Sequence, residues 1–292
     1  MDVQMAGDLS DDMVIWRYMG LDKFINLLED SALFFAPLSF YEKTDPFEGY
    51  PPAKIVQLLY SISDPFYKQL KGNIEVYDLY AHTQVGNAKF IESLESLRKK
   101  LLERPADFRK SYSLIAKSTL VNCWHASPHE SEAMWKLYGE SHKGVAIRST
   151  VGDLRKALEG AQQIDWVKKM FLGQVKYLNY ADPEITPKDC LVGGIMTPLL
   201  KRISFAHEKE IRAFFVSDVN YKNLNSFTPK PYEMKIDVSQ ILNGVYISPY
   251  VDISYSKAIR AVCRAYGLTC DVVESNLLQD GDAIYDFLND ES

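Results

Sequence analysis

Several features that mark common protein classes are missing from this sequence of 292 residues. No apolar run approaches the length of about 18 residues that spans a bilayer. The acidic residues 1–13 have no apolar core, so we expect no secretory leader. The four cysteines form no C-x-x-C pair, which disfavours a zinc ribbon or a disulfide framework. We therefore expect a soluble, cytoplasmic protein with reduced thiols and no membrane contact.

The signatures of the large nucleotide-binding and hydrolase families are also absent. The sequence contains no G-x-x-x-x-G-K-[ST], no G-x-G-x-x-G after a predicted strand and no G-x-S-x-G. This disfavours a P-loop NTPase, a Rossmann dehydrogenase and an α/β-hydrolase. The formal net charge of −6 disfavours a general DNA- or RNA-binding surface, which needs a basic footprint, although a small basic groove is compatible with it.

What is present is the composition of an ordinary globular protein. Hydrophobic residues make up 47% and charged residues 25%, which excludes disordered and fibrous classes. A chain of this length buries enough surface to fold without disulfide or metal staples. No linker rich in glycine, serine or proline and no internal repeat divides it, so we predict a single domain over residues 1–292.

Hydrophobic periodicity predicts a mixture of strands and helices. Strands are expected at 14–19, 32–36, 120–124, 143–149, 173–178, 210–217, 232–237, 244–247 and 270–274. Helices are expected at 21–30, 131–140 and 254–266, and most of 52–117 is helical, most clearly 88–103, where Pro105 is predicted to end the helix. Because strands and helices do not alternate strictly, the prediction is an α+β fold: a mixed central sheet with an inserted helical layer at about 52–117.

The most informative candidate site is the segment 205–216, FAHEKEIRAFFV. On a strand, Glu208, Glu210 and Arg212 share one face, which places two carboxylates and a guanidinium together. Such a cluster can hold ribose hydroxyls or stabilise a developing cation. A structural ion-pair network produces the same pattern, so both interpretations stay open.

Two further polar positions are candidates. Arg17 lies on a predicted core strand, where an unpaired charge is costly, so its partner is either one of these glutamates or a ligand phosphate. The loop 43–49 places Asp45 and Glu48 beside a rigid Pro-Phe pair. It is either an Asx-type turn or a binding loop.

A metal site at Cys123, His125 and His129 is not predicted. Histidines four residues apart suit zinc on one helix face, but Pro128 interrupts that helix and no third ligand is evident. A nucleophilic pair of Cys123 and His125 lacks an orienting partner.

A set of motifs in fixed order runs from about residue 14 to residue 274. They are Trp16-Arg17-Tyr18, Asp45-Pro46-Phe47-Glu48, Cys123-Trp124, Met134-Trp135-x-x-Tyr138, Lys143-Gly144-Val145-x-Ile147, Val175-x-Tyr177, Lys201 and Glu208-x-Glu210-x-Arg212. In order and spacing they resemble a large bacterial family known as domain of unknown function 2971. Thr44 stands where that family usually has Asn, and the helical insert is longer than in many relatives. The resemblance implies that seven polar side chains converge on one site: Arg17, Asp45, Glu48, Lys201, Glu208, Glu210 and Arg212.

A weaker analogy, at the level of the fold, links the chain to ADP-ribosyltransferases. It implies NAD as cofactor, with Arg17 holding it, Glu210 stabilising an oxocarbenium-like ribose and Glu208 orienting the acceptor. Tyr18 or Trp135 would stack on nicotinamide or adenine. Such an enzyme would bind a small nucleotide ligand, modify a protein or nucleic-acid acceptor, and act as a toxin or phage-defence effector.

Two alternatives stay open beside this enzyme. One is a metal-dependent nucleic-acid-processing enzyme, in which Mg²⁺ binds the carboxylates of Asp45, Glu48, Glu208 and Glu210. The other is a non-catalytic sensor or interaction module, in which the same residues form a buried ion network. The sequence leaves the oligomeric state open as well.

Overall fold

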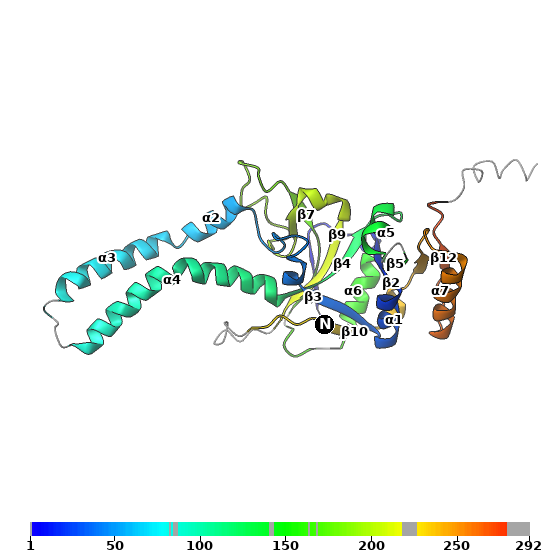
Figure 1. Cartoon of the computed structure of the whole chain (residues 1–292), viewed down its shortest axis with the longest axis horizontal. Coiled ribbons are helices and arrows are strands. Elements are labelled where there is room, and N and C mark those ends of the chain that lie inside the picture. The colour runs from blue at the N-terminus through cyan, green and yellow to red at the C-terminus, as the bar shows by residue number, and fades with distance from the viewer. Residues whose placement is uncertain are drawn as a thin grey trace, which may run out of the picture.

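The computed structural model describes residues 2–278 except 82, 84–86, 140–142, 163, 168 and 218–226. The described part is an α+β fold, with helices packed on a mixed sheet and a long helical arm that leaves one side (Figure 1). The predicted fold class is therefore confirmed.

Ten described strands form the main sheet, in the order β1-β6-β9-β4-β2-β5-β11-β12, with β3 on β4 and β10 on β3. Their bounds are β1 Val3–Ala6, β2 Val14–Gly20, β3 Ala32–Pro37, β4 Thr119–Ala126, β5 Gly144–Thr150, β6 Met170–Gln174, β9 Glu210–Val216, β10 Tyr232–Lys235, β11 Gly244–Ile247 and β12 Val272–Glu274. The β1–β6 and β11–β12 pairs are parallel, and the other pairs of this sheet are antiparallel.

The predicted strand at 173–178 is wrong as one element. Strand β6 ends at Gln174, and β7 (Lys176–Leu178) belongs to a separate parallel pair with β8 (Leu200–Arg202). The backbone explains the break, because the Val175 N–H still donates to the Glu210 carbonyl on β9, whereas the Lys176 N–H donates to the Leu199 carbonyl. The chain changes its pairing partner between two adjacent residues.

The main core covers one face of the sheet. Ile15, Trp124, Ile211 and Phe215 point to this face and pack against buried side chains of helices α1 (Leu21–Asp30), α6 (Val151–Glu159) and α7 (Ile253–Ala265). Helix α6 was not predicted. Because side chains alternate along a strand, Glu210 and Arg212 lie on the opposite face. The short helix α5 (Glu132–Tyr138) packs against β2.

One edge of strand β4 pairs with two different strands. Ile15 and Trp16 of β2 pair with one end of that edge, whereas Ala36 and Pro37 of β3 pair near the other end. Strand β2 leaves β4 immediately after Trp16, so Arg17 stands at the point where the two strands diverge. This position sets the surroundings of the Arg17 side chain.

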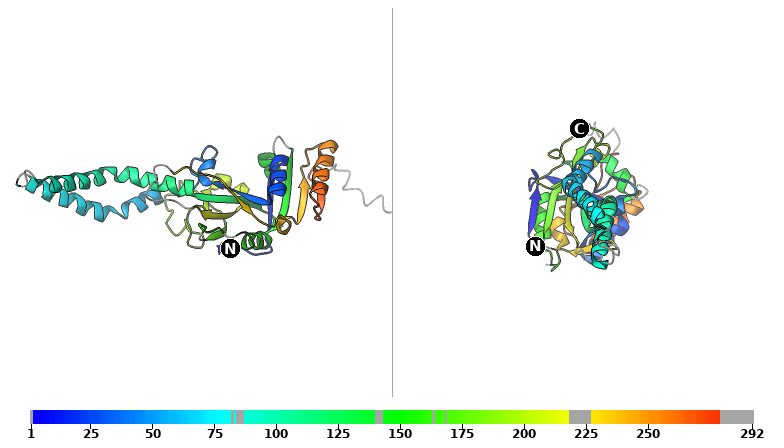
Figure 2. Two further views of the ribbon diagram at one scale, coloured as in Figure 1. Left: turned by 90° about the horizontal axis from the view of Figure 1, so that it is seen from below. Right: turned by 90° about the vertical axis from the view of Figure 1, so that its left-hand side faces the viewer.

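The insert predicted to be a helical layer is instead an arm. Helices α2 (Ala53–Ser61), α3 (Asp64–Ala81) and α4 (Ala88–Ser118) extend away from the sheet, with α3 and α4 side by side as a hairpin (Figures 1 and 2). No described helix is both long enough and apolar enough to cross a membrane.

A single apolar seam holds the two long helices of the arm together. Leu70 and Ile74 of α3 are buried against Leu94 of α4. Near the base of the seam, the Arg104 guanidinium lies 4.0 Å from the ring centre of Tyr60 and pairs with Asp64 at 2.6 Å. Two helices provide one seam only, which is why the apolar side chains of Ile91 and Leu102 on α4 are exposed.

The prediction that Pro105 ends the helix is wrong, since α4 continues to Ser118. Proline removes the hydrogen bond to the carbonyl of Leu101. Leu101 is only partly buried and Pro105 is exposed, so water can satisfy that carbonyl. A helix on an exposed arm tolerates the residue that would disrupt one in a core.

The base of the arm depends on Gly49. Its φ of +81° is left-handed, and an added Cβ would meet Leu38 at 3.3 Å and Ala116 of α4 at 3.4 Å. Glycine therefore lets the loop that leads into α2 pass close to the end of α4.

We predict that Gly49→Ala lowers the free energy of unfolding by about 2 kcal/mol, because backbone strain and crowding add. Gly267→Ala is the matched control: its φ is also positive, at +67°, but nothing lies within 4 Å of an added Cβ. Strain alone should cost it about 1 kcal/mol. Chemical denaturation measures both, and equal losses would contradict the packing role of Gly49.

Candidate functional site

A buried cluster of five charged side chains lies on the face of the sheet opposite the main core. Two parts of the chain that are distant in sequence supply it: the loop after the 3-10 helix η1 (Leu38–Tyr41), and the continuous run of β8, η3 (Ile203–Glu208) and β9. The five charged side chains are only 2–8% exposed. We call Glu48, Lys201, Glu208, Glu210 and Arg212 the charged cluster.

Arg212 is the centre of the cluster. Its Nε donates to Glu210 Oε2 at 2.7 Å and its Nη2 to Glu210 Oε1 at 3.1 Å, so the two side chains are joined in the bidentate manner that suits a guanidinium and a carboxylate. Its Nη1 donates to Glu48 Oε1 at 2.7 Å and to the Pro198 carbonyl at 2.8 Å. A single side chain thus ties β9 to two other segments.

Lys201 joins the three carboxylates from the other side. Its Nζ donates to Glu210 Oε1 at 2.7 Å and to Glu208 Oε2, and it lies 3.6 Å from Glu48 Oε2. The ammonium also stands 4.8 Å from the ring centre of Phe205. Both oxygens of Glu210 are therefore bound by cations.

Glu208 joins the cluster by a route different from the one predicted. It does not lie on the strand, because η3 ends at Glu208 and β9 begins at Glu210. Lys209, between them, adopts a left-handed backbone with φ of 42°. This turn brings the Glu208 side chain back beside Glu210, so the two carboxylates meet although strand alternation does not hold there.

The charges of the cluster do not balance, since three carboxylates face two cations. Burial disfavours ionised Glu210, but the positive charges of Arg212 and Lys201 outweigh it and hold its pKa well below the usual range. Burial, together with the neighbouring Glu210, raises the pKa of Glu208 to about 7. Glu208 is therefore the carboxyl of the cluster that takes up a proton most readily, which relieves the surplus negative charge.

Two tyrosines and a histidine border the cluster. The Tyr138 hydroxyl donates to Glu208 Oε1 at 3.3 Å, and the Tyr177 hydroxyl accepts from the Glu210 backbone N–H at 2.9 Å. The His125 Nδ1 lies 2.7 Å from the Glu208 carbonyl oxygen. None of these three residues was expected in the site from the sequence, where the only signal was that Tyr138 and Tyr177 belong to the ordered motifs.

Asp45 lies next to the cluster but has its own partner. Its Oδ1 pairs with Arg202 at 2.6 Å and accepts the Phe47 backbone N–H at 3.0 Å, which is the geometry of an Asx turn. The Arg202 guanidinium lies 4.8 Å from the Phe47 ring centre. The loop 43–49 thus holds its shape through the turn that the sequence suggested as one of two interpretations.

Arg17 is not joined to the cluster. It has no ion pair with the carboxylates that the structure describes, and its Nη1 is buried without a hydrogen-bond partner in that part of the chain. Its guanidinium lies 5.9 Å from the Trp124 ring centre and is close to Tyr41 and Cys123. Burial lowers the pKa of Arg17.

The two aromatic residues predicted to stack on a ligand are used inside the fold. The Tyr18 hydroxyl accepts the Ser131 backbone N–H at 2.7 Å, and its ring meets Trp135 edge to face at 4.9 Å. The Trp135 indole is fully buried and donates to Glu130 Oε2 at 2.9 Å.

Metal binding finds little support in this arrangement. Glu48, Glu208 and Glu210 each contact Lys201 or Arg212, so a divalent cation would have to displace a side-chain cation. Burial and the nearby Glu210 raise the pKa of Cys123, which keeps that residue a thiol at neutral pH. Among the described residues, no three His, Cys, Asp or Glu side chains form a group that could hold a metal ion.

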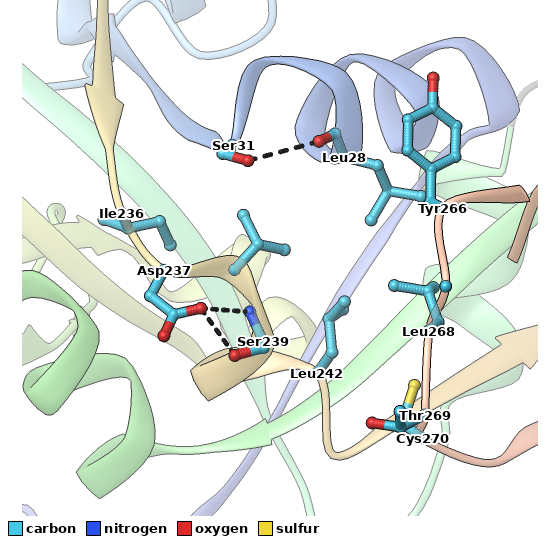
Figure 3. Close-up of a pocket in the computed structure, with 12 residues that line it drawn as sticks. Leu28, Ser31, Ile236, Asp237, Ser239, Leu242, Tyr266, Leu268, Thr269 and Cys270 are labelled. Atoms are coloured by element: carbon cyan, nitrogen blue, oxygen red, sulfur yellow. Dashed lines mark hydrogen bonds between the residues drawn. The ribbon is translucent and has the colours of Figure 1, made fainter.

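One open pocket of the structure lies away from the charged cluster. A cavity of about 250 Å³ lies between α1, the 3-10 helix η5 (Val238–Ile241) and the chain after α7 (Figure 3). Leu28, Leu242 and Tyr266 line it, and its Asp237 is already bound to the backbone N–H and hydroxyl of Ser239. No lining residue belongs to the charged cluster, so this cavity gives no access to it.

Glu208→Gln tests the unbalanced charge. Because the pKa of Glu208 is about 7 in the folded chain and 4.5 as an ordinary carboxyl, the folded state holds the extra proton between these values. Stability of the natural chain therefore falls as pH rises from about 4.5 to 7, by up to about 3 kcal/mol relative to the variant. Denaturation across this range measures the difference. Glu92→Gln, the same substitution at an exposed position of α4, is the control for the loss of a carboxylate as such. A pH-independent difference for Glu208→Gln would contradict the charge imbalance.

Comparisons with known proteins do not identify this chain. No family model, no curated protein and no solved structure matches the chain. The resemblance noted in the sequence therefore stays a prediction.

Proposed function

We propose that this chain is a non-catalytic interaction module, in which the charged cluster fixes the helical arm to the sheet so that the arm can engage a partner. The observation that carries this proposal is that Arg212 and Glu210 are already bound to partners within the chain. They bind each other in bidentate fashion, and Arg212 also binds Glu48, which precedes the arm.

The state of Glu210 supports a structural role over a catalytic one. Catalysis needs a group that can reach a substrate, but Glu210 is buried and both of its oxygens already accept from Arg212 and Lys201. A substrate would have to replace these contacts in a buried site. Removing one member of a buried ion network leaves an uncompensated charge, so the folded chain strongly resists that exchange.

The path of the chain supports the link to the arm. Glu48 is followed directly by Gly49, which packs on Ala116 of α4, and the chain then enters α2. The Thr197 hydroxyl donates to the Gly49 carbonyl at 3.2 Å, and the Tyr180 hydroxyl donates to the Tyr50 carbonyl at 2.8 Å. The arm therefore leaves from a segment held by ionic, hydrogen-bond and packing contacts.

We predict that Arg212→Gln lowers the free energy of unfolding by about 3–5 kcal/mol, because Glu48 and Glu210 lose their buried counterion. Arg98→Gln, which removes an exposed ion pair with Asp78, should cost less than about 1 kcal/mol.

Glu48→Gln is the milder companion variant, because it breaks only the ionic link to the arm. Hydrogen exchange should quicken at residues 45–56 and stay unchanged in β11. A folded Arg212→Gln chain of natural stability, or exchange that quickens equally everywhere, would contradict the anchoring role.

The unpartnered Nη1 of Arg17 favours a second candidate function. A buried guanidinium without a counterion attracts an anion such as a nucleotide phosphate. In an ADP-ribosyltransferase-like enzyme, a phosphate of the NAD would supply this anion. The bond between the ribose and nicotinamide would break, a bond from the ribose to the acceptor would form, and the acceptor's proton would pass to a carboxylate. Glu208, with its pKa of about 7 and its contact to Tyr138, is a better base than the doubly bound Glu210.

Incubation with NAD labelled in its nicotinamide separates the two candidates. Under the second, the natural chain releases nicotinamide, and Arg17→Met and Glu208→Gln each lower the rate by about 100-fold or more. Under the interaction role, no release occurs and NAD does not raise the melting temperature. Release that survives both substitutions would contradict the residue assignment of the second candidate.

A further inference from the structure

Helix α3 has a second apolar face that the hairpin does not cover. Phe66, Val76, Leu79 and Tyr80 are 62%, 49%, 76% and 59% exposed, respectively. On a helix that turns about 100° per residue, Phe66, Tyr80 and Val76 lie within about 80° of one another, and Leu79 lies about 60° beyond Val76, so the four side chains form one broad stripe on α3. We call these four residues the arm stripe. The seam with α4 lies on another side of the helix, at Leu70 and Ile74.

Gly72 lies within the arm stripe, and no contact among the described residues requires a glycine there. It precedes Val76 by four residues and Leu79 by seven, which places it on the same side of α3. An added Cβ at this position would meet nothing within 4 Å. Glycine in the middle of a helix costs about 1 kcal/mol relative to alanine. A glycine that no intramolecular contact requires fits a close approach by another helix.

The charges beside the arm stripe would complement the same charges on a second copy of the chain. Lys68 precedes Gly72 by one turn, and Glu75 follows it by nearly one turn, on the same flank of the stripe. Both side chains are exposed. If a second α3 runs antiparallel and crosses at Gly72, Lys68 of each copy faces Glu75 of the other. In a parallel twofold pair, the flanks that carry Lys68 and Glu75 would lie on opposite sides of the contact, so this complementarity would be lost.

The large side chains obey the same symmetry. The midpoint between Phe66 and Tyr80 falls at residue 73, and that between Lys68 and Glu75 falls between residues 71 and 72. An antiparallel pair therefore sets Phe66 of one copy against Val76 and Tyr80 of the other, on both sides of the glycine crossing. A twofold contact requires one surface to complement itself in this manner.

From these observations we propose that the arm stripe binds the arm stripe of a second copy of this chain, as an antiparallel dimer of hairpins centred on Gly72. The proposal names the partner of the arm and rests on the interaction role proposed above. The two α3 helices form the middle of a four-helix assembly, with each α4 on the outside. The hairpin projects from the sheet, so two copies can pair along α3 (Figure 2).

Analytical ultracentrifugation of the full chain over a range of concentrations tests the dimer. The natural chain should sediment as a dimer, and Leu79→Glu as a monomer. Gly72→Leu should also be monomeric, because a large side chain at the crossing separates the helices. Since leucine favours the helix over glycine, loss of the dimer in Gly72→Leu cannot come from an unfolded arm. Leu102→Glu is the control: Leu102 is 80% exposed on α4, away from the stripe, and its replacement should leave the dimer intact.

Charge exchange tests the antiparallel arrangement. Lys68→Glu and Glu75→Lys should each raise the dissociation constant of the dimer by about tenfold or more, because each places like charges opposite at two symmetric positions. The double variant should restore natural affinity. A natural chain that is monomeric throughout, or a double variant as weak as the singles, would overturn the proposal. If such a monomer still loses stability in Arg212→Gln, the anchoring role stands and only the partner is wrong.

Discussion

The fold depends on the neutralisation of one guanidinium, that of Arg212. A charge on a central strand, almost without solvent, is stable only when carboxylates surround it. One of them, Glu210, is two residues away on the same strand face, whereas the other, Glu48, lies 164 residues earlier in the chain. Satisfying Arg212 therefore forces the loop before the arm onto the sheet. The position of the arm follows from an electrostatic requirement in the middle of the domain.

The same requirement explains why the cluster behaves as a closed unit. Two cations and three carboxylates leave one negative charge in excess, and the structure places it on Glu208, where a proton can compensate. Arg17 does not supply the missing positive charge. It stands where β2 leaves β4, and its guanidinium lies beside Trp124. The guanidinium of Arg17 and the surplus negative charge of the cluster are thus not paired with each other.

The arm is under a different constraint from the sheet. A sheet closes its core with helices from several parts of the chain, but a hairpin of two helices has only one mutual seam. The described arm buries Leu70 and Ile74 in that seam and leaves a second apolar face with a glycine at its centre. The charged cluster therefore pairs its members inside the domain, while the arm leaves apolar surface outside. This contrast is why we assign the interaction to the arm.

Local periodicity in the sequence was sufficient to predict the α+β class, the helix after β2, the helical character of the insert and the shared strand face of Glu210 and Arg212. These features depend on neighbours a few residues away, which the sequence displays directly. Only the tertiary structure decided the rest. It placed Glu48 and Lys201 around Arg212, turned Glu208 back through Lys209, left Arg17 unpaired and extended α4 past Pro105. Each of these outcomes depends on which distant segments meet and on where water remains, and no pattern within one segment contains that information.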